Sequence, residues 1–377
     1  MKVMIVVSHL LGTGHLARAV TLARAYQNAG DEVCVVSGGM PAPQLSTGEI
    51  ALVQLPPVRS NGVDFSRLIC ADASEASPEF LAHRQEKLLS TFANFAPDVL
   101  ITELFPFGRR ILRDEFQALL KLAKAQTVPP LICASIRDIL APPSKPKKAV
   151  FADEMVTAFY DTVLVHSDAS LMPLDLSWPV SETLLGYLQY TGFVAPKAAG
   201  PHPTREGAGE IIVSAGGGDV GGPIYEAVLA AAPSIQHPVR LLVGGASPQS
   251  RVNALSARAP ANVTIEPVRK DFRQMLSGAA ASVSLCGYNT ALDILQACTP
   301  AVFIPFDEGN EVEQGLRADA LAKRPGIATL RRADLTAQTL TAALNDVIDA
   351  PRRDAMTSSF GGAERTALLT RDLWNAR

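Results

Sequence analysis

Short apolar runs alternate with longer helical patterns along this chain, and this alternation limits the possible folds more than any other feature. It is typical of parallel sheets covered by helices on both faces, so we predict the α/β class. The expected helices include residues 15–28, 78–95 and 109–125. The expected strands are residues 3–7, 32–36, 99–102, 131–134, 163–166, 211–214, 240–243, 263–266, 281–285, 301–304 and 328–330.

The chain has 377 residues, more than one hydrophobic core usually serves, and this length predicts two domains. The stretch 196–209 is rich in Pro and Gly and is typical of a linker. Two doubly wound, Rossmann-like domains would face a cleft at the carboxyl ends of their strands, where such sheets bind ligands. We therefore predict domains at 1–195 and 210–355. Residues 356–377 are expected to contain a C-terminal helix, which could pack back on the N-terminal domain.

Composition and charge exclude several classes of protein. Hydrophobic residues make up 47% of the chain and charged residues 19%, which favours large buried cores over disorder. The net charge of −3 gives no electrostatic reason to expect nucleic acid as a partner. The five cysteines form no C-x-x-C pair, which favours a reducing cytoplasm. No apolar run approaches the roughly 20 residues of a spanning helix, so we expect a cytoplasmic protein with at most peripheral contact with the inner membrane.

The loop Gly12-Thr13-Gly14-His15 follows the first expected strand and opens the first expected helix. It is not a complete dinucleotide fingerprint, because Ala17 stands in place of the third glycine and the second strand does not end in an acidic residue. At a helix N-terminus the dipole would lower the pKa of His15 and keep its imidazole neutral and able to accept a proton. The alternative is a histidine that only caps the turn.

Two glycine loops follow strands in the second half of the chain. Gly216, Gly217, Gly218 and Asp219 form the first loop, where missing side chains let a bulky anion approach the backbone. The alternative is a flexible turn that allows close helix packing. The second loop begins at Gly244 and is a weaker candidate for the same task.

A strand, the turn 286–290 and a helix that carries Asp293 follow one another near the C-terminus. A second strand then leads to a helix that begins near Glu311 and contains Gln314. Both turns would present free backbone N–H groups and positive dipole ends, which suit a diphosphate. Asp293 and Gln314 are placed to hold a ribose or a sugar.

Several motifs of other chemistries are missing from the sequence. It contains no G-x-x-x-x-G-K-[ST], no H-E-x-x-H, no Asp-x-Asp pair and no G-x-S-x-G. A metal-bound diphosphate of the usual kind would need acidic ligands such as that Asp pair. We therefore expect no metal and no other cofactor, and stabilisation of a leaving diphosphate by helix ends.

Six short pieces stand in a fixed order along the chain. They are Gly12-Thr-Gly-His-Leu-Ala-Arg-Ala19, Pro97-Asp-Val-Leu-Ile-Thr-Glu-Leu-Phe-Pro-Phe-Gly108, Ile136-Arg-Asp-Ile-Leu140, Tyr190-Thr-Gly-Phe193, Cys286-Gly-Tyr-Asn-Thr290, and Glu313-Gln314 with Arg317-Ala318. Together the pieces cover most of the chain, and their order is more specific than any one of them. They resemble the GT-B glycosyltransferases of a family 28-like group, which includes the bacterial N-acetylglucosaminyltransferase that completes the lipid-linked peptidoglycan precursor. The chain is similar, more closely still, to a set of predicted bacterial glycosyltransferases.

The resemblance implies roles for individual residues. His15 matches a histidine that acts as candidate base on an acceptor hydroxyl, and the loop 216–218 matches a loop beside the pyrophosphate. Asp293 stands where the peptidoglycan enzyme has a glutamate that grips the ribose of UDP, and Gln314 stands where an amide contacts the donor sugar. Asp is one methylene shorter than Glu, which leaves the ribose contact and the nucleotide open. The residues expected at the donor are Gly216, Gly217, Gly218, Asp219, Gly244, Val268, Arg269, Lys270, Gly287, Tyr288, Asn289, Thr290, Asp293, Glu313 and Gln314, with the base pocket at Val268, Arg269 and Lys270.

The predicted function is a metal-independent, inverting transfer of a sugar from a nucleoside diphosphate, most simply a UDP-sugar, to a hydroxyl acceptor in cell-envelope, polysaccharide or glycolipid biosynthesis. A nucleotide-sugar hydrolase or 2-epimerase on the same fold, and a non-catalytic nucleotide-sugar-binding protein, remain open. Glu103 would orient His15; alternatively it forms a surface ion pair with Arg109 or Arg137, arginines that could equally serve an acidic acceptor. The residues expected on the acceptor side are Gly12, Thr13, Gly14, Arg109 and Arg137.

A basic segment of the first half, Lys145-Pro-Lys147-Lys148 with Arg109-Arg110, is expected on loops. It would suit anionic lipid at a membrane surface. The alternative is an ordinary solvated face, which is what most short charge runs are.

Overall fold

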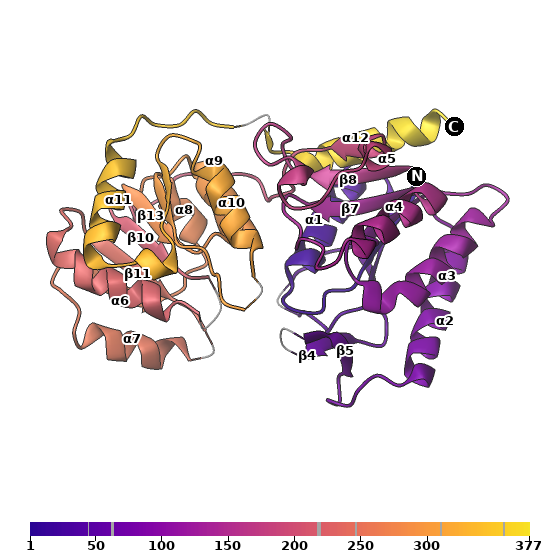
Figure 1. Ribbon diagram of the computed structural model, residues 1–377, viewed down its shortest axis with the longest axis horizontal. Helices are drawn as coiled ribbons and strands as arrows, with labels where there is room; N and C mark the ends of the chain where they lie inside the picture. The colour runs from indigo at the N-terminus through magenta and orange to yellow at the C-terminus, as the bar shows by residue number, and fades with distance from the viewer. Residues whose placement is uncertain (44, 62–63, 217–219, 246, 310, 357–358) are drawn as a thin grey trace. The chain divides into compact units, whose positions relative to one another are not determined.

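A computed structural model of the chain describes all residues except 44, 62–63, 217–219, 246, 310 and 357–358. The chain divides into two compact units (Figure 1). Unit 1 comprises Met1–Pro196 and Ser358–Arg377, and unit 2 comprises Lys197–Thr357. The stretch predicted as a linker thus belongs almost entirely to unit 2, and the C-terminal segment returns to unit 1.

Unit 1 is built on a seven-stranded sheet in the order β3-β2-β1-β6-β7-β8-β9, and all of its strands are parallel. The order reverses at β1, between β2 and β6, so the loops after β1 and β6 leave the sheet in the position where doubly wound folds bind ligands. The strands are β1 (Lys2–Val7), β2 (Glu32–Ser37), β3 (Ala51–Gln54), β6 (Val99–Glu103), β7 (Leu131–Arg137), β8 (Thr162–His166) and β9 (Leu188–Tyr190).

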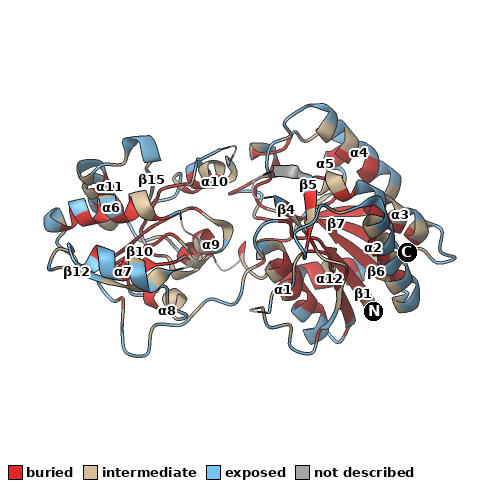
Figure 2. Cartoon of the chain, turned by 90° about the horizontal axis from the view of Figure 1, so that it is seen from below, coloured by how far each residue is buried: buried red, intermediate tan, exposed pale blue. Residues whose placement is uncertain are grey.

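Helices cover both faces of this sheet, as the alternating side chains of β1 show. Val3, Ile5 and Val7 share a core with α1 (Gly14–Asn28) and α12 (Gly362–Asn375), whereas Met4 and Val6 share a core with the helices of the other face. Figure 2 shows the strands buried and the outer faces of the helices exposed. The helices on that other face are α2 (Pro78–Phe95), α3 (Arg113–Lys124), α4 (Lys147–Phe159) and α5 (Glu182–Leu185), with the short 3₁₀ helices η1 (Arg110–Leu112) and η2 (Leu174–Leu176).

The C-terminal helix α12 packs against α1, as Figure 1 shows. The Tyr26 hydroxyl lies 2.7 Å from Thr370 Oγ1, and Arg371 donates to the carboxylate of Asp31 at 2.8 and 2.9 Å. The helix therefore completes the core of unit 1 although all of unit 2 precedes it in the chain.

Some elements of unit 1 differ from the prediction. The helix expected near 109–125 is present as α3, but its first part is the 3₁₀ helix η1, and Arg109, with a left-handed φ of 57°, lies before it. Strand β3 and the antiparallel hairpin of β4 (Val58–Asn61) and β5 (Asp64–Cys70) were not expected. The basic residues Lys147 and Lys148 begin helix α4 rather than lying on a loop.

Unit 2 repeats the same winding in a six-stranded parallel sheet of order β12-β11-β10-β13-β14-β15. The strands are β10 (Ile211–Ser214), β11 (Val239–Val243), β12 (Val263–Pro267), β13 (Ala281–Ser284), β14 (Ala301–Phe303) and β15 (Ile327–Thr329), each within one residue of its predicted position at both ends. The helices are α6 (Gly222–Ala231), α7 (Pro248–Ser256), α8 (Phe272–Leu276), α9 (Tyr288–Ala297), α10 (Glu313–Leu321) and α11 (Ala337–Asp349), with η3 (Ala232–Ser234) and η4 (Arg332–Asp334). The prediction of two Rossmann-like α/β domains is confirmed, while the cleft between them stays a prediction. No helix within the described residues is long and apolar enough to cross a membrane.

Candidate active site

His15 and Glu103 meet at the carboxyl ends of two neighbouring strands of unit 1. His15 is the second residue of α1, which follows β1, and Glu103 is the last residue of β6. His15 Nδ1 lies 3.0 Å from Glu103 Oε1, and the two side chains are 12% and 1% exposed. The contact expected between these residues is therefore present, at the point where the strand order reverses.

Glu103 is held from three sides within this buried site. Arg18 Nη2 donates to Oε1, the same oxygen that faces His15, and Ser135 Oγ donates to Oε2 at 2.6 Å. A surface ion pair with Arg109 or Arg137 is therefore wrong, because Glu103 is buried and its partners come from α1 and β7. Arg18 and Ser135 were not predicted as partners of Glu103. For Arg18 a signal was present, since a residue three positions after His15 lies on the same face of a helix.

Burial sets the protonation of both groups. Burial, helped by the charges of Arg109 and Arg18, lowers the pKa of His15 to about 3, although the hydrogen bond to Glu103 acts in the opposite direction. The predicted direction is present, but its main cause is burial and not the helix dipole. Burial raises the pKa of Glu103, but the charge of Arg18 and the hydrogen bond from His15 outweigh it and lower the pKa. The site thus contains a neutral imidazole and an ionised carboxylate.

The charge state fixes which nitrogen of His15 carries the proton. A carboxylate only accepts hydrogen bonds, so Nδ1 must carry the hydrogen that faces Glu103. Arg18 Nη2 lies 3.1 Å from the same Nδ1, but its hydrogen is directed to Glu103. The lone pair of His15 is consequently on Nε2, which makes no hydrogen bond within the described part of the chain.

The loop between β1 and α1 is open around His15. Gly12 has a left-handed φ of 65°, which favours glycine, and added side chains at Gly12 or Gly14 would meet no atom within 4 Å. Thr13 is the N-cap of α1, but its side chain makes no capping hydrogen bond. This loop therefore leaves room beside His15, as the acceptor-side prediction requires.

Arg109 and Arg137 belong to the same edge of the sheet. Arg109 Nε donates to the carbonyl of Ser8 at 2.5 Å, and Arg109 is close enough for its charge to lower the pKa of His15. Arg137 is the last residue of β7 and is paired in register with His166 of β8. Both predicted acceptor-side arginines thus lie on the edge that carries His15 and Glu103.

In unit 2, the start of α9 offers free backbone donors. Gly287 is the N-cap residue in an extended conformation, and it has no side chain with which to cap the helix. The first amides of a helix have no partner within the helix, so those of Asn289 and Thr290 are available to an anion. An added side chain at Gly287 would meet no atom within 4 Å, so a ligand can approach this backbone closely.

The start of α10 differs from the prediction, because its amides are already bonded. The Glu311 carboxylate accepts from the backbone N–H groups of Glu313 and Gln314 at 2.8 and 3.3 Å. The expectation of two equally free helix ends is therefore wrong, and a diphosphate would meet a carboxylate at the second one. The side-chain carbonyl of Gln314 accepts from Phe306 N at 3.2 Å, which leaves its NH₂ group for a sugar.

Asp293 is not a free carboxylate. Its Oδ1 accepts from Arg273 Nε at 2.6 Å, and Arg273 Nη2 donates to Gln296 Oε1 at 2.9 Å. Burial raises the pKa of Asp293, and the charge and hydrogen bond of Arg273 oppose the rise. A ribose at this position would meet a carboxylate that already has an arginine partner, which the sequence analysis did not foresee.

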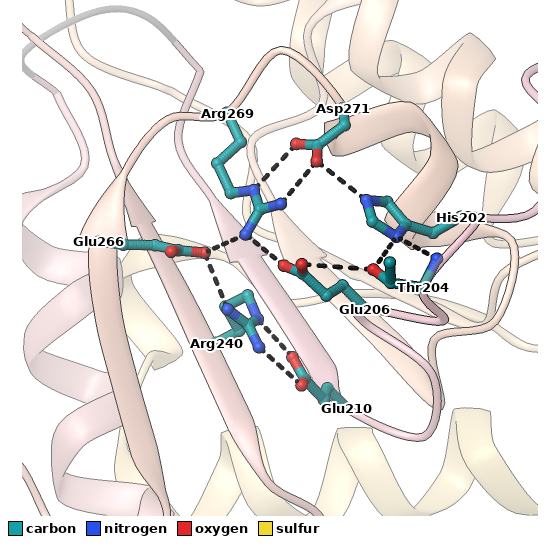
Figure 3. Close-up of polar contacts among 8 residues, drawn as sticks. All are labelled: His202, Thr204, Glu206, Glu210, Arg240, Glu266, Arg269 and Asp271. Carbon is teal, nitrogen blue, oxygen red and sulfur yellow. Dashed lines mark hydrogen bonds and ion pairs between the residues drawn. The ribbon is translucent and has the colours of Figure 1, made fainter.

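A surface pocket of about 290 Å³ lies beside Arg273, at the start of α8. Of the predicted base pocket only Lys270 lines it; Val268 is exposed elsewhere on the loop. Arg269 is committed to an ion-pair network, in which it donates to Asp271 and Glu206 (Figure 3). The pocket is lined by Ala199, Lys270, Asp271, Arg273 and Gln274.

The two glycine loops are only partly described. Gly216 has a left-handed φ of 72°, and its N–H lies 3.2 Å from Ser214 Oγ. Gly217, Gly218 and Asp219 lie outside the described residues. The carbonyl of Gly244 accepts from Arg251 Nη1 at 3.0 Å. The described residues contain no group of three or more His, Cys, Asp or Glu side chains arranged to hold a metal ion.

The second half of the chain matches a known family of domains. Residues 212–369 match the glycosyltransferase family 28 C-terminal domain. The chain is a GT-B glycosyltransferase with a family 28-like C-terminal domain. An enzyme of this class transfers a sugar from a nucleotide-sugar donor to an acceptor. No curated protein sequence matches the chain.

Solved structures match this glycosyltransferase over nearly its whole length. MurG from Acinetobacter baumannii is 18% identical with a TM-score of 0.65, and the match covers 98% of this chain and 99% of that one. A UDP-glucosyltransferase from Polygonum tinctorium is 15% identical with a TM-score of 0.66, covering 100% and 99% of the two chains. VinC, solved in complex with dTDP, is 16% identical with a TM-score of 0.64, covering 100% and 96%. At these identities the likeness establishes the fold.

Proposed function

We propose that this glycosyltransferase transfers a sugar from a UDP-sugar to a hydroxyl acceptor with inversion at the anomeric carbon, and that His15 is the base. The observation that carries the proposal is the buried contact of His15 Nδ1 with Glu103 Oε1 at 3.0 Å. It leaves a lone pair on Nε2 and holds the ring in one orientation, as a third group does for the base in other enzymes.

The proton moves as the new bond forms. The acceptor oxygen attacks the anomeric carbon while its proton passes to His15 Nε2, and the bond from that carbon to the diphosphate breaks with its electron pair on the diphosphate oxygen. A single displacement inverts the configuration. A base with a pKa of about 3 suffices if the proton moves after the new bond has largely formed, because the hydroxyl of the acceptor becomes strongly acidic once its oxygen bonds to carbon. Glu103 then stabilises the imidazolium, as the carboxylate of a catalytic triad does.

On the donor side, the proposal uses the groups of unit 2. The start of α9 would bind the diphosphate through the amides of Asn289 and Thr290, and Lys270 in the adjoining surface contributes positive charge. Asp293 would contact the ribose and Gln314 the sugar, with backbone groups of 268–270 reading the base. UDP is chosen because of the family 28 match and the relative named as a UDP-glucosyltransferase. These groups stabilise a leaving diphosphate without a metal ion, and chelation tests that point.

The acceptor belongs, in this proposal, to cell-envelope, polysaccharide or glycolipid biosynthesis at the cytoplasmic face of the membrane. A basic group on unit 1 supports peripheral contact with anionic lipid. Burial lowers the pKa of Lys148, and the charges of Arg110, Lys145 and Lys147 lower it further, so these four cations lie close together.

A kinetic experiment tests the base. Release of UDP is measured from UDP-glucose and UDP-N-acetylglucosamine, with and without a polyprenyl-linked sugar acceptor, for wild type and His15→Gln. We expect His15→Gln to lower kcat by about 10² to 10⁴ with little change in the KM for the donor. His83→Gln is the control, because His83 is an exposed residue of α2. EDTA should leave the rate unchanged.

Three outcomes would contradict the proposal. Equal release of UDP and free sugar without acceptor would identify a hydrolase. Donor binding without any turnover would identify a binding protein. Unchanged kcat in His15→Gln would remove the base. A thermal-shift panel of UDP, GDP, dTDP, CMP and NAD, run first, identifies the nucleotide, because a ligand of the native state raises its melting temperature.

A further inference from the structure

Three polar side chains lie buried behind Glu103 and take no part in the proposed proton transfer. Ser135 and His166 are 0% exposed and Thr191 is 2% exposed. They come from β7, the end of β8 and the residue after β9. Thr191 belongs to the piece Tyr190-Thr-Gly-Phe193, which the site described above does not use. Polar groups this deep must be paired with one another or they destabilise the fold.

The contacts form one continuous chain that ends at Glu103. Thr191 Oγ1 lies 2.8 Å from His166 Nδ1, His166 Nε2 lies 3.0 Å from Ser135 Oγ, and Ser135 Oγ lies 2.6 Å from Glu103 Oε2. Glu103 and Ser135 are direct register partners in the sheet, so the backbone fixes their spacing. Glu103 Oε1 then faces His15.

The direction of each hydrogen bond follows from counting donors. The Glu103 carboxylate can only accept, so the single hydrogen of Ser135 points to it. Ser135 Oγ must then accept from His166, which places the hydrogen of His166 on Nε2. His166 Nδ1 consequently accepts from the hydroxyl of Thr191. His166 and His15 thus hold opposite tautomers.

One competing hydrogen bond exists at Thr191, the end of the hydrogen-bond chain that lies farthest from Glu103. The Thr191 hydroxyl also lies 3.3 Å from the carbonyl of Gly192. The contact with His166 Nδ1 is 0.5 Å shorter, at 2.8 Å, and is the better hydrogen bond. If His166 instead carried its hydrogen on Nδ1, Ser135 would have to donate to His166, and Glu103 Oε2 would lose the serine donor.

We propose that His166 is a positioning residue, which acts through Ser135 to hold the Glu103 carboxylate and thereby to keep the proton of His15 on Nδ1. The inference rests on the proposed role of His15 as base. With Nδ1 protonated, the lone pair of His15 remains on Nε2 for the acceptor. A His15 with the opposite tautomer would present a hydrogen to the acceptor and could not remove its proton.

Burial of His166 keeps this arrangement constant over a wide pH range. The charged groups that act on it are Arg18 of α1 and Glu103 of β6. Burial lowers the pKa of His166 to about 3; Arg18 lowers it further and Glu103 opposes the change. His166 is therefore neutral above about pH 5, and each of its nitrogens keeps one fixed role.

Thr191, the last residue of the hydrogen-bond chain, is held in place by the C-terminal segment of unit 1. Arg365 of α12 donates through Nε to the carbonyl of Thr191 at 2.6 Å, and Phe193 N donates to the carbonyl of Ser359 at 2.8 Å. Gly192 has a φ of 84°, and an added side chain there would collide with Arg365. The return of the chain to unit 1 thus helps to hold the residue that orients His166.

Nitrogen NMR of the full chain, labelled with ¹⁵N-histidine, reads the tautomers directly and without substrate. The six histidine signals are assigned by single His→Gln variants. We expect His166 with its hydrogen on Nε2 and His15 with its hydrogen on Nδ1 at pH 7. A wild-type His166 with its hydrogen on Nδ1 would overturn the proposal.

Two substitutions at 166 separate positioning from packing. Gln can place an N–H near Ser135, whereas Leu has a similar volume and no donor. We expect His166→Leu to mix the tautomers of His15 and to lower kcat about 10- to 100-fold, the range typical of supporting partners, with the donor KM unchanged. His166→Gln should recover most of the rate. Unchanged His15 signals and kcat in His166→Leu would contradict the proposal.

A second pair of variants serves if His166→Leu does not fold. Thr191→Val removes the hydroxyl at constant shape, and Thr191→Ser restores it. Only the Val variant should broaden the His166 signals and lower kcat, and equal behaviour of the two would count against the proposal. Failure of the base itself is distinguishable, because His15→Gln would then keep its activity while the wild-type tautomers remain as expected.

Discussion

The two units build their polar networks in opposite ways. In unit 1, Glu103 and Arg84 are 1% and 0% exposed, and their partners come from strands and helices far apart in the chain. In unit 2, Arg240 and Arg269 are joined to carboxylates whose side chains are 19–38% exposed, at the edge of the sheet (Figure 3). The first kind of network is enclosed by the core, and the second is in contact with water.

This difference indicates which part of the candidate site is rigid before a substrate binds. A buried, paired network has few alternative arrangements, because each broken contact leaves a buried charge or polar group alone. Solvated ion pairs rearrange at little cost. The proposed base in unit 1 is therefore held by the fold, whereas the side chains near the surface pocket of unit 2 can exchange partners when a ligand binds.

The largest effect should come from breaking a buried ion pair of unit 1. Arg84 donates to Glu115 at 2.7 and 3.1 Å and to the carbonyls of Gly38 and Pro56 at 2.8 and 2.6 Å. Arg84→Met leaves the Glu115 carboxylate buried without this partner, and we expect a loss of about 3–5 kcal/mol in unfolding free energy. Urea denaturation measures it.

The control for Arg84→Met is Arg258→Met in unit 2. Arg258 and Glu226 form a pair whose side chains are 53% and 54% exposed. Such exposed pairs contribute about 0–1 kcal/mol, so this variant should unfold almost as the wild type does. Equal losses in the two variants would show that burial does not separate the two networks.

Acid should destabilise unit 1 next most strongly. Burial lowers the pKa of His15 and of His166 to about 3. Below their unfolded pKa of about 6.5 the unfolded chain binds protons that the folded chain does not, so this stability is present above pH 6.5 and is lost as the pH falls toward 3. At pH 5 we expect a loss of about 2 kcal/mol per histidine.

Calorimetry between pH 7 and pH 5 tests the acid effect. The double variant His15→Gln/His166→Gln should lose much less stability over this range than the wild type does, although its stability at pH 7 is lower. An equal loss in both proteins would mean that other groups cause the destabilisation.

The sheets could be predicted from the sequence because their strands are continuous apolar runs. Strands β10, β13 and β14 of unit 2 and the central strands of unit 1 are buried on both faces, and burial of that kind appears in the sequence itself. Strand β3 was missed because Ala51 and Leu52 are exposed at the edge of the sheet. The hairpin of β4 and β5 begins with Val58-Arg-Ser-Asn61, which has no clear alternation.

The candidate site could be predicted only where the position of a motif in the sequence already fixes its place in the fold. His15 follows β1 and Glu103 ends β6, and any sheet of this order places these two strands side by side. Ser135, His166 and Thr191 come from three later segments, and only the register of the strands brings them together. Likewise, the sequence gives no sign that Arg273, twenty residues before Asp293, occupies its carboxylate.

A buried arginine in unit 2 tests whether its donor side also has a rigid part. Arg317 is 1% exposed and donates through Nη1 to the carbonyl of Cys286 at 2.9 Å, and its guanidinium lies 5.8 Å from the ring centre of Tyr288. It therefore holds the turn before α9. We expect Arg317→Met to raise the donor KM about tenfold with kcat little changed, because a hydrogen bond from a charged group is lost.

The control for Arg317→Met lies on the same helix. Asp319 of α10 is 54% exposed and pairs with Arg331 at 2.5 Å, so Asp319→Asn changes the charge of α10 without touching the turn. Steady-state kinetics at varied donor concentration should separate the two variants. If Arg317→Met left the donor KM unchanged, the whole donor side of unit 2 would consist of contacts that can rearrange when a ligand binds.

The smallest effect is expected from the solvated network of unit 2, again when an arginine is replaced by methionine. Arg240 donates to Glu210 at 2.6 and 2.9 Å and to Glu266 at 3.0 Å, yet its partners remain in contact with water. We expect Arg240→Met to cost about 1 kcal/mol or less. Because exposed charges are screened, the cost should shrink when NaCl is raised, whereas the cost of Arg84→Met should stay constant. Urea denaturation of both variants at low and high salt measures the difference, and a salt-independent loss in Arg240→Met would show that this network is enclosed after all.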